Sequence, residues 1–268
     1  MTLFNVSNRE IEDLETVNIA LLGISEDLDN KLTDTIILCS YKPKEAEVSL
    51  ISIPRDTFIG KDSSSAIANE KINVIFHKDK EKLLNAISDI VGFKVKYYAV
   101  INNNALIKIV DIIGGIKFDV PIDMDYDDPT QDLHIHLKKG MQKIDGEEAE
   151  QLLRFRHNND GTSYPGNYGD NDFGRMRTQR AFIEETVKQS LRLRNVINFK
   201  RIYNTMLENV ETNYNIEDAK KYIPTLADFK YENIISNQLP GKSEMLNNLW
   251  FYVYDEEKTE KLVEELGI

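Results

Sequence analysis

The run Val48-Ser49-Leu50-Ile51-Ser52-Ile53, which ends at Pro54-Arg55-Asp56, is the stretch that decides the architecture of this chain. Similar short apolar runs, rich in β-branched residues, occupy residues 17–22 and 35–39. In the first half of the chain these runs alternate with stretches of helical spacing. Such alternation is typical of an α/β architecture, in which helices flank a sheet.

Further elements follow from the spacing of apolar residues and from helix-ending signals. A helix is expected to open at Asn104 and to end at Gly114-Gly115, because glycine is common just past a helix end. The absence of an internal repeat or low-complexity linker favours one domain over residues 17–268. The other expected elements are strands at 97–101, 116–120, 133–137 and 250–254, helices at 83–91, 146–156, 173–194, 196–210, 216–229 (interrupted at Pro224) and 256–266, and a loop at 157–171.

The charge of the chain limits the kinds of partner that it can have. Its 268 residues carry a formal net charge of −12, which argues against nucleic acid as a partner, because nucleic acids select basic surfaces. Any site for phosphate must therefore be local. The single cysteine, Cys39, permits no intramolecular disulfide and lies in an apolar run.

No apolar stretch reaches the roughly 18 residues that a membrane-spanning helix needs, and the N-terminal residues are polar. Two interpretations remain open from the residues alone. The chain could be a cytoplasmic protein, or it could be the part of a longer protein that remains after a membrane anchor is removed.

Charged side chains gather at strand ends and around the long loop, where open α/β sheets build ligand sites. Arginine offers a planar fork of donors that matches phosphate oxygens two at a time, so converging arginines suit a pyrophosphate. A carboxylate such as Asp34 could hold a divalent cation that bridges the phosphates. Arg175 and Gln179 are four residues apart and share a helical face. The candidate arginines are Arg55, Arg154, Arg156, Arg175 and Arg177.

Each of these residues also has an ordinary structural interpretation. Arg154 and Arg156 could be a surface pair, and Asp34 could be a turn residue. His134 and His136 share one face of the strand at 133–137 and could bind zinc, but with no cysteine nearby a solvated strand face is favoured. Lys71 could neutralise phosphate or simply be solvated.

A series of short motifs follows in order along residues 17–187. The motifs are Leu21-Leu22-Gly23, Thr33-Asp34-Thr35, Ser52-Ile53-Pro54-Arg55-Asp56, Lys71-Ile72-Asn73, Tyr97-Tyr98-Ala99-Val100, Val110-Asp111-Ile112-Ile113-Gly114-Gly115-Ile116, Asp145-Gly146-Glu147-Glu148-Ala149, Arg154-Phe155-Arg156, Asp172-Phe173-Gly174-Arg175 and Gln179. No single motif is specific, but their joint order and spacing resemble the LytR-CpsA-Psr family, which attaches glycopolymers to peptidoglycan.

The resemblance implies α-β-α layers around a mixed sheet and a Mg²⁺-assisted phosphotransferase. The donor would be a polyprenyl-pyrophosphate glycan, and the acceptor would be peptidoglycan or a similar surface polymer. It also implies Asp34 as metal ligand, and Asp34, Arg55, Asp172 and Arg175 as catalytic residues. The pyrophosphate would be bound by Arg55, Lys71, Arg154, Arg156, Arg175, Arg177 and Gln179.

The resemblance also implies a location and an anchor. Family members have an N-terminal membrane helix and an extracellular catalytic domain, so residues 1–16 are expected to be a lead-in whose membrane helix has been removed. The expected location is the cell membrane, through a single-pass anchor, with the catalytic domain outside the cell.

Two positions depart from the family pattern. Ser25 stands where the family usually has an aspartate, and Leu32 stands where it usually has an arginine. These departures support an alternative function, a non-catalytic paralogue that binds polyprenyl phosphate or a partner. Within the catalytic hypothesis, Asp34 or Asp172 could act as the base that activates the acceptor.

Overall fold

The computed structural model describes residues 14–24, 33–76, 79–169, 171–190, 199–228 and 230–268. Its backbone divides into two compact units, of which the first comprises Met1–Val100 and Glu211–Ile268 and the second comprises Ile101–Val210. The single domain expected over 17–268 stays a prediction. Among the residues described, no helix is long and apolar enough to cross a membrane.

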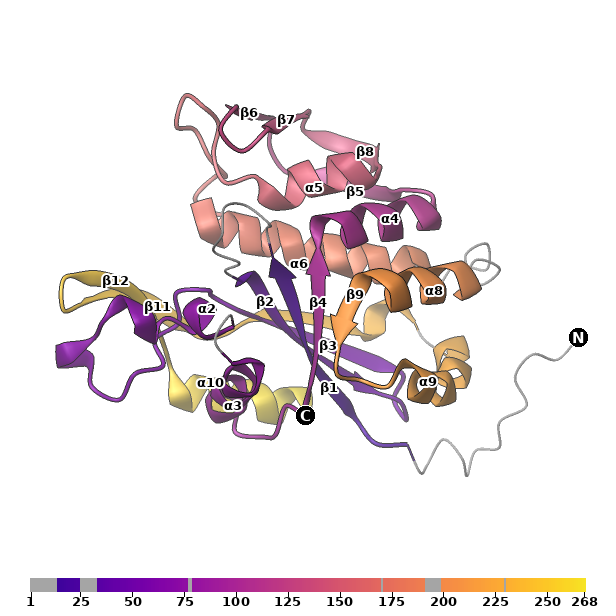
Figure 1. Cartoon of the computed structure of the whole chain (residues 1–268), viewed down its shortest axis with the longest axis horizontal. Helices are drawn as coiled ribbons and strands as arrows, with labels where there is room; N and C mark the ends of the chain where they lie inside the picture. Colours follow the sequence, from indigo (N-terminus) through magenta and orange to yellow (C-terminus); the bar gives the residue numbers. More distant parts are fainter. Residues whose placement is uncertain (1–13, 25–32, 77–78, 170, 191–198, 229) are drawn as a thin grey trace, which may run out of the picture. The chain divides into compact units, whose positions relative to one another are not determined.

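The first unit is built on a six-stranded sheet (Figure 1) with the order β10-β3-β2-β1-β4-β9. β2 pairs in antiparallel register with both β1 and β3, whereas β10 joins β3 in parallel, so the sheet is mixed. The expected mixed α/β architecture is thereby confirmed. The strands are β1 (Val17–Ile24), β2 (Thr33–Lys42), β3 (Glu47–Ile53), β4 (Tyr97–Asn102), β9 (Val210–Thr212) and β10 (Ile234–Gln238).

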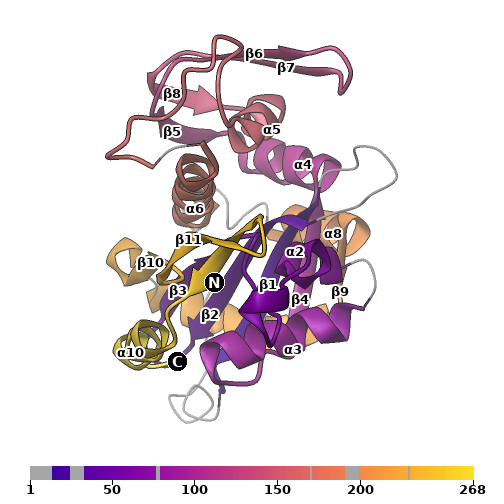
Figure 2. The same ribbon diagram turned by 90° about the vertical axis from the view of Figure 1, so that its left-hand side faces the viewer.

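Two helices of this unit, α3 (Lys80–Val91) and α10 (Glu256–Leu266), contact each other (Figure 2). Each begins after an aspartate whose side chain accepts a backbone N–H of the first turn, Asp79 for α3 and Asp255 for α10. The other elements of the unit are η1 (Ser63–Ser65), η2 (Ala68–Glu70), α2 (Ile72–Ile75), α9 (Ile216–Ala219), η3 (Lys220–Asp228), η4 (Tyr231–Asn233) and the hairpin of β11 (Gly241–Leu246) with β12 (Leu249–Tyr254).

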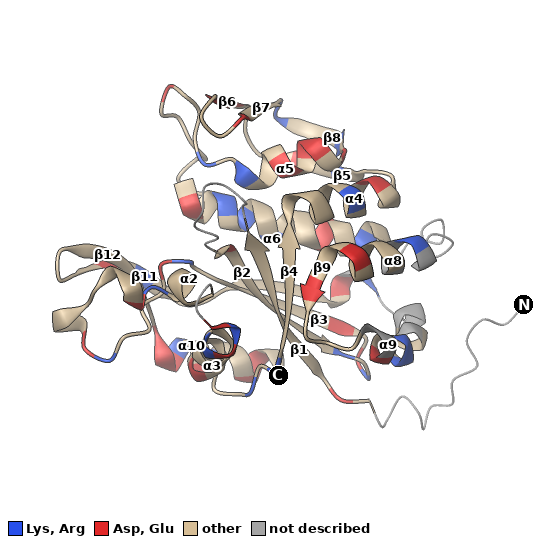
Figure 3. Cartoon of the chain, viewed as in Figure 1, with Lys and Arg blue, Asp and Glu red and all other residues tan. Residues whose placement is uncertain are grey.

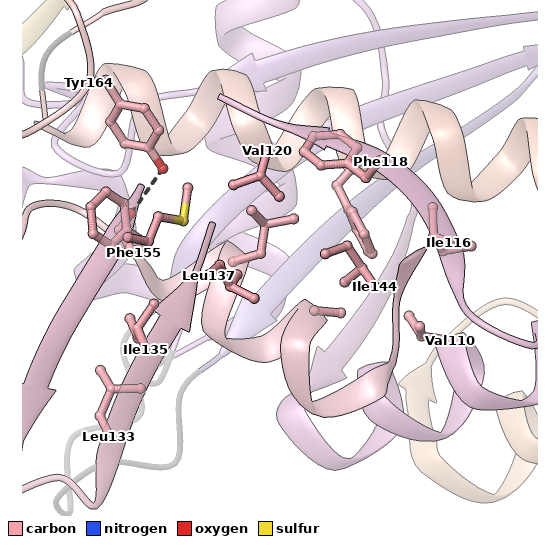
Figure 4. Packing of buried hydrophobic residues seen from close by; sticks show 14 of the residues in the cluster. Val110, Ile116, Phe118, Val120, Leu133, Ile135, Leu137, Ile144, Phe155 and Tyr164 are labelled. Atoms are coloured by element: carbon pink, nitrogen blue, oxygen red, sulfur yellow. Dashed lines mark hydrogen bonds between the residues drawn. The ribbon is translucent and has the colours of Figure 1, made fainter. Parts of the chain in front are cut away.

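The second unit packs helices against two antiparallel strand pairs, β5 with β8 and β6 with β7. Figure 4 shows its core, in which Phe155, Tyr164 and Phe118 lie among aliphatic side chains. The elements are α4 (Asn103–Ile113), β5 (Ile116–Val120), β6 (Met124–Asp128), β7 (Leu133–Leu137), β8 (Gly140–Ile144), α5 (Gly146–Arg154), α6 (Asn171–Ser190) and α8 (Phe199–Asn209).

Several expected boundaries are wrong by a few residues, for local reasons. α4 begins at Asn103 rather than Asn104, because the side chain of Asn102 accepts the N–H of Ala105 and caps the helix. It ends before Gly114, which is left-handed as expected. α5 ends at Arg154 rather than at residue 156, because Phe155 turns to extended backbone and buries its ring.

The expected helices of the C-terminal half differ more. α6 begins at Asn171 instead of residue 173, and the expected end at 194 lies outside the described residues. In the helix expected at 196–210, residues 196–198 also lie outside, and Val210 belongs to β9. The stretch 216–228 is divided after Ala219 into α9 and the 3-10 helix η3, so the interruption expected at Pro224 is wrong in position, because Pro224 lies inside η3. Residue 229 lies outside the described residues.

Five strands were not predicted from the sequence: β6, β8, β9, β10 and β11. β6 reads Met-Asp-Tyr-Asp-Asp and has little intrinsic strand preference, so its pairing with β7 makes it a strand.

Candidate functional site

In the first unit, the candidate residues lie where the start of β2 adjoins the end of β3. The antiparallel register pairs Ile36 with Ile53, so the residues just before Ile36 run beside those just after Ile53. This places Asp34 beside Arg55, whose Nη1 donates to Asp34 Oδ1 at 2.6 Å. A strand register therefore joins two motifs that are separated by 21 residues.

The segment that follows Arg55 brings Lys71 to the same place. Phe58 forms an antiparallel bridge with Lys71, and the N–H of Asn73 donates to the carbonyl of Arg55. The Lys71 ammonium lies 2.9 Å from Asp56 Oδ1. Asp56 is thus a second carboxylate beside Asp34, although the sequence did not select it as a candidate site residue.

We call Asp34, Arg55, Asp56 and Lys71 the β2–β3 cluster. Its side chains are about one quarter to two fifths exposed, so these ion pairs remain in contact with water. Partly exposed ion pairs contribute only about 0–1 kcal/mol each. A ligand that offers better partners can therefore rearrange them at low cost. The two carboxylates have the hard oxygen atoms that Mg²⁺ prefers, and the two cations suit phosphate oxygens.

In the second unit, one carboxylate holds two arginines. Asp172, at the start of α6, lies 2.9 Å from Arg156 Nε and 2.9 Å from Arg175 Nη2. Arg156 Nη2 also donates to Asp172 Oδ2 at 3.0 Å, so the contact is two-pronged. We call these three residues the α6 cluster. Two guanidiniums with one carboxylate leave a net positive charge, which suits an anionic ligand. Figure 3 shows this pattern along α6, with acidic colour at its first turn and basic colour on the next turns.

Arg154 and Arg156 lie in different backbone conformations, because α5 ends between them. Arg154 is still helical and pairs with Glu150 one turn earlier, at 3.0 Å. Phe155 then turns into the core, and Arg156 follows in non-helical backbone, with its side chain 42% exposed. Arg156, but not Arg154, has a described contact with Asp172.

The buried face of α6 supports this cluster. Arg175 and Gln179, which their spacing of four places on one helical face, are both buried. Gln179 Nε2 donates to the carbonyl of Leu153 at 3.0 Å, in the last turn of α5, where helices have unpaired carbonyls. Gln179 thus joins α6 to α5.

Gly174 allows the long loop to pack on α6. A Cβ at this position would lie 2.2 Å from Tyr164 Cδ2 and 2.4 Å from the carbonyl oxygen of Gly169. Tyr164 is itself buried, and its hydroxyl donates to the carbonyl of Phe155. The loop over 157–169 is therefore partly a core element, and Tyr164 holds it to the end of α5.

Arg177 and Arg180 extend the basic face of α6. The Arg177 guanidinium stacks over the ring of Tyr168 at 4.5 Å and donates to loop carbonyls, so its described contacts lie outside the α6 cluster. Burial, together with the nearby charge of Arg177, lowers the pKa of Arg180 to about 10. Arg180 Nη1 is buried with no hydrogen-bond partner among the described residues. Arg180 is not among the residues selected from the sequence, because its burial depends on tertiary packing.

The candidate residues therefore fall into two groups, the β2–β3 cluster of the first unit and, in the second unit, the residues at the end of α5, just after it, and on α6. Their roles stay predictions. The departures at Ser25 and Leu32 lie outside the described residues.

Comparison with known proteins identifies the family. The model of the LytR_cpsA_psr family matches residues 3–267, which is nearly the whole chain. The chain belongs to the LytR-CpsA-Psr family. This confirms the resemblance inferred from the ordered motifs.

Relatives within the LytR-CpsA-Psr family include proteins with named activities. Biofilm regulatory protein A of Streptococcus mutans is 26% identical over 254 residues, covering 88% of this chain and 59% of that protein. The polyisoprenyl-teichoic acid–peptidoglycan teichoic acid transferase TagV of Bacillus subtilis is 26% identical over 234 residues, covering 86% of this chain and 58% of that protein. The chain thus spans about three fifths of the length of these two relatives.

A solved structure agrees with the fold. The crystal structure of Bacillus subtilis TagV matches with a TM-score of 0.76 at 25% identity, covering 94% of this chain and 98% of that chain. The mixed α/β fold of this chain is therefore the same as the fold of TagV.

Proposed function

We propose that this chain transfers a glycopolymer phosphate from a polyprenyl-pyrophosphate carrier to peptidoglycan or a similar cell-surface acceptor. The observation that carries the proposal is the α6 cluster, in which Asp172 holds Arg156 and Arg175 together. A guanidinium fork matches the oxygen atoms of a phosphate group, and Asp172 holds two of them close together. Family membership and the transferase activity in the name of TagV support the same reaction.

In the proposed reaction, an acceptor hydroxyl attacks the phosphorus that carries the glycan. The bond between this phosphorus and the bridging oxygen breaks, and polyprenyl phosphate leaves with the electron pair. The acceptor proton passes to a base, for which Asp34 and Asp172 remain the candidates. Arg156 and Arg175 would hold the phosphate oxygens and stabilise their charge during transfer, which is how phosphoryl transfer is mainly catalysed.

The remaining candidates have proposed roles in binding. Arg55, Lys71, Arg154 and Gln179 would contribute donors to the pyrophosphate. Arg177, whose guanidinium stacks on Tyr168 of the loop, would also bind the pyrophosphate.

We propose Mg²⁺ as the metal of this reaction. The residues present fit such an ion, because Asp34 and Asp56 offer carboxylate oxygens and both are bound to cations that a metal could replace. When bound, Mg²⁺ would offset the negative charge of the pyrophosphate. Asp34 was expected from the sequence, and Asp56 is added by the geometry of the β2–β3 cluster.

The site of action follows from the donor. A polyprenyl carrier is a membrane lipid, so the proposed reaction takes place at a membrane surface. We propose the outer face of the cell membrane, where peptidoglycan is assembled, and single-pass anchoring remains part of this proposal.

The test is turnover by the purified chain. The protein is incubated with a lipid-linked glycan, Mg²⁺ and peptidoglycan fragments, and released polyprenyl phosphate is measured together with glycan on the acceptor. Arg156→Ala should weaken binding of the lipid pyrophosphate about 10- to 100-fold, which corresponds to the loss of a charged hydrogen bond of about 1.5–3 kcal/mol. Arg201→Ala removes an exposed arginine of α8 and should leave binding unchanged.

The outcomes separate two functions. Release of polyprenyl phosphate that depends on Arg156 supports the transferase. Arg156-dependent binding without release would favour the alternative, a non-catalytic paralogue, which Ser25 and Leu32 motivate. Equal affinity in the Arg156→Ala variant and the parent chain would overturn the proposal that the α6 cluster binds the pyrophosphate.

A further inference from the structure

The exposed face of the β6–β7 hairpin carries a group of histidines and aspartates that are not members of the α6 cluster. The antiparallel register pairs Asp127 with His134 and Asp125 with His136. Along β7, His134 and His136 alternate with the buried residues Leu133, Ile135 and Leu137. The two imidazoles and the two carboxylates therefore share one exposed face.

One carboxylate oxygen lies within reach of both imidazoles. Asp127 Oδ1 forms a short contact with His134 Nδ1, and it lies 3.5 Å from His136 Nε2. One ligand atom from each of these three residues lies within 4.8 Å of the other two. A single ion could therefore contact all three.

The other nitrogen of each imidazole faces a further carboxylate. His136 Nδ1 lies 2.9 Å from Asp125 Oδ1, and His134 Nε2 lies 3.8 Å from Asp132 Oδ1. In metal sites, histidine ligands commonly donate their second N–H to a carboxylate, which orients the ring. Asp125 and Asp132 stand where such orienting groups would be needed.

Hydrogen bonds on both edges of the hairpin fix these strands. On the outer edge of β6, the side chains of Asn158 and Asn159 accept the N–H groups of Asp125 and Asp127 at 2.7 Å. On β7, the N–H of His136 donates to Gln151 of α5 at 3.1 Å. The backbone that carries the group is thus positioned by the rest of the second unit, as a preorganised site requires.

We propose that this face binds a divalent transition metal ion, with Zn²⁺ as the best fit, through His134, His136 and Asp127. Imidazole nitrogen with one carboxylate is a ligand set that suits Zn²⁺, whereas Mg²⁺ prefers oxygen ligands alone. Three protein ligands leave a fourth position for water or for an anionic group of a ligand. An ion here would also join β6 to β7, and a two-stranded hairpin has little stability by itself.

The sequence alone favours a solvated strand face for the two histidines. The register adds the third ligand, because Asp127 is placed across from His134 on a strand that the sequence did not predict. This site is separate from the proposed Mg²⁺ ligands Asp34 and Asp56 in both residues and ligand chemistry.

The experiment measures Zn²⁺ binding by the full chain without a histidine tag, by calorimetry and by competition with a chromogenic chelator. We expect one Zn²⁺ per chain. The double variant His134→Ala/His136→Ala should lose this binding, and Asp125→Asn should weaken it about 10-fold. His77→Ala is the matched control for loss of a histidine and should bind as the parent does.

Three further measurements make the result decisive. Circular dichroism should show that the variants remain folded, as expected because the His134 and His136 side chains are 54% and 56% exposed. Co²⁺ should give the visible absorption of a tetrahedral site with the parent chain and not with the double variant, and excess Mg²⁺ should not displace Zn²⁺. Equal Zn²⁺ affinity of the double variant and the parent, or displacement by Mg²⁺, would overturn the proposal without bearing on the transferase reaction.

Discussion

The substitution Gly174→Ala tests how closely the long loop is packed against α6 beside Arg175. The added Cβ would meet Tyr164 Cδ2 at 2.2 Å and the carbonyl oxygen of Gly169 at 2.4 Å. Real Cβ atoms do not approach this closely, so the ring and the backbone must move. Tyr164 has little room to move, because its ring is buried, contacts Phe155 and stacks on Tyr168.

The magnitude follows from two opposing effects. Overpacking a dense core costs about 1–3 kcal/mol. Replacing glycine by alanine inside a helix returns about 0.5–1 kcal/mol. Because two atoms, one of them a backbone oxygen, lie far inside contact distance, the overpacking cost falls in the upper part of its range, about 2–3 kcal/mol. We therefore expect a net loss of about 1–2.5 kcal/mol in the free energy of unfolding, with a melting temperature about 2–6 °C lower in a chain of this size.

The assay is urea denaturation followed by circular dichroism, with Gly166→Ala as the matched control. A Cβ at Gly166 would meet nothing within 4 Å, so this loop substitution should change stability by less than about 0.5 kcal/mol. In a Tyr164→Ala background, the Gly174→Ala substitution should cost less, because one of the two clashing groups is gone. Equal midpoints for Gly174→Ala and Gly166→Ala would refute the packing argument.

Three further predictions follow from single contacts. Gln179→Ala removes the donor to the carbonyl of Leu153 and should lower the free energy of unfolding by about 1–3 kcal/mol, measured in urea; no change would show that water replaces this donor. Hydrogen bonds from Lys258 lower the pKa of Asp255 in the folded chain below its ordinary value of 3.8. The ionised Asp255 should therefore stabilise α10 above pH 3.8, and this stabilisation should be lost as the pH falls through the lowered pKa. The difference in melting temperature between the parent and Asp255→Asn should accordingly shrink in acid, and a constant difference would contradict this. Cys39 is half-buried, and desolvation raises the pKa of its thiol to about 12, so a thiol reagent at pH 8 should modify it more slowly in the native chain than in urea, and equal rates would contradict the raised pKa.

Strands β1 to β4 of the six-stranded sheet and several helices were predictable because their signals are local. The runs at 17–22, 35–39 and 48–53 are apolar and β-branched, and all three are strands. The helix at 256–266 was predicted with its observed bounds, since Asp255 and Gly267 mark its two ends. By contrast, β6 is a strand because it pairs with β7, and this pairing cannot be predicted from the strand preference of its own residues.

The candidate residues show the same division. Motif order in the sequence was enough to select Asp34, Arg55, Arg156, Asp172 and Arg175, because a family match depends on residue identity and spacing. It could not show that Asp172 bridges two arginines, since the contact depends on Phe155 ending α5 and turning Arg156 out of the helix.

Family, fold class and most candidate residues can thus be read from the residues in order, because periodicity and motif spacing are properties of the linear chain. The partners of those residues cannot be read in this way. Asp56 beside Lys71, Gln179 on the carbonyl of Leu153, and Asp127 between two histidines arise from strand register and helix packing. These contacts bring together residues that are distant in sequence, and only the folded backbone sets their distances.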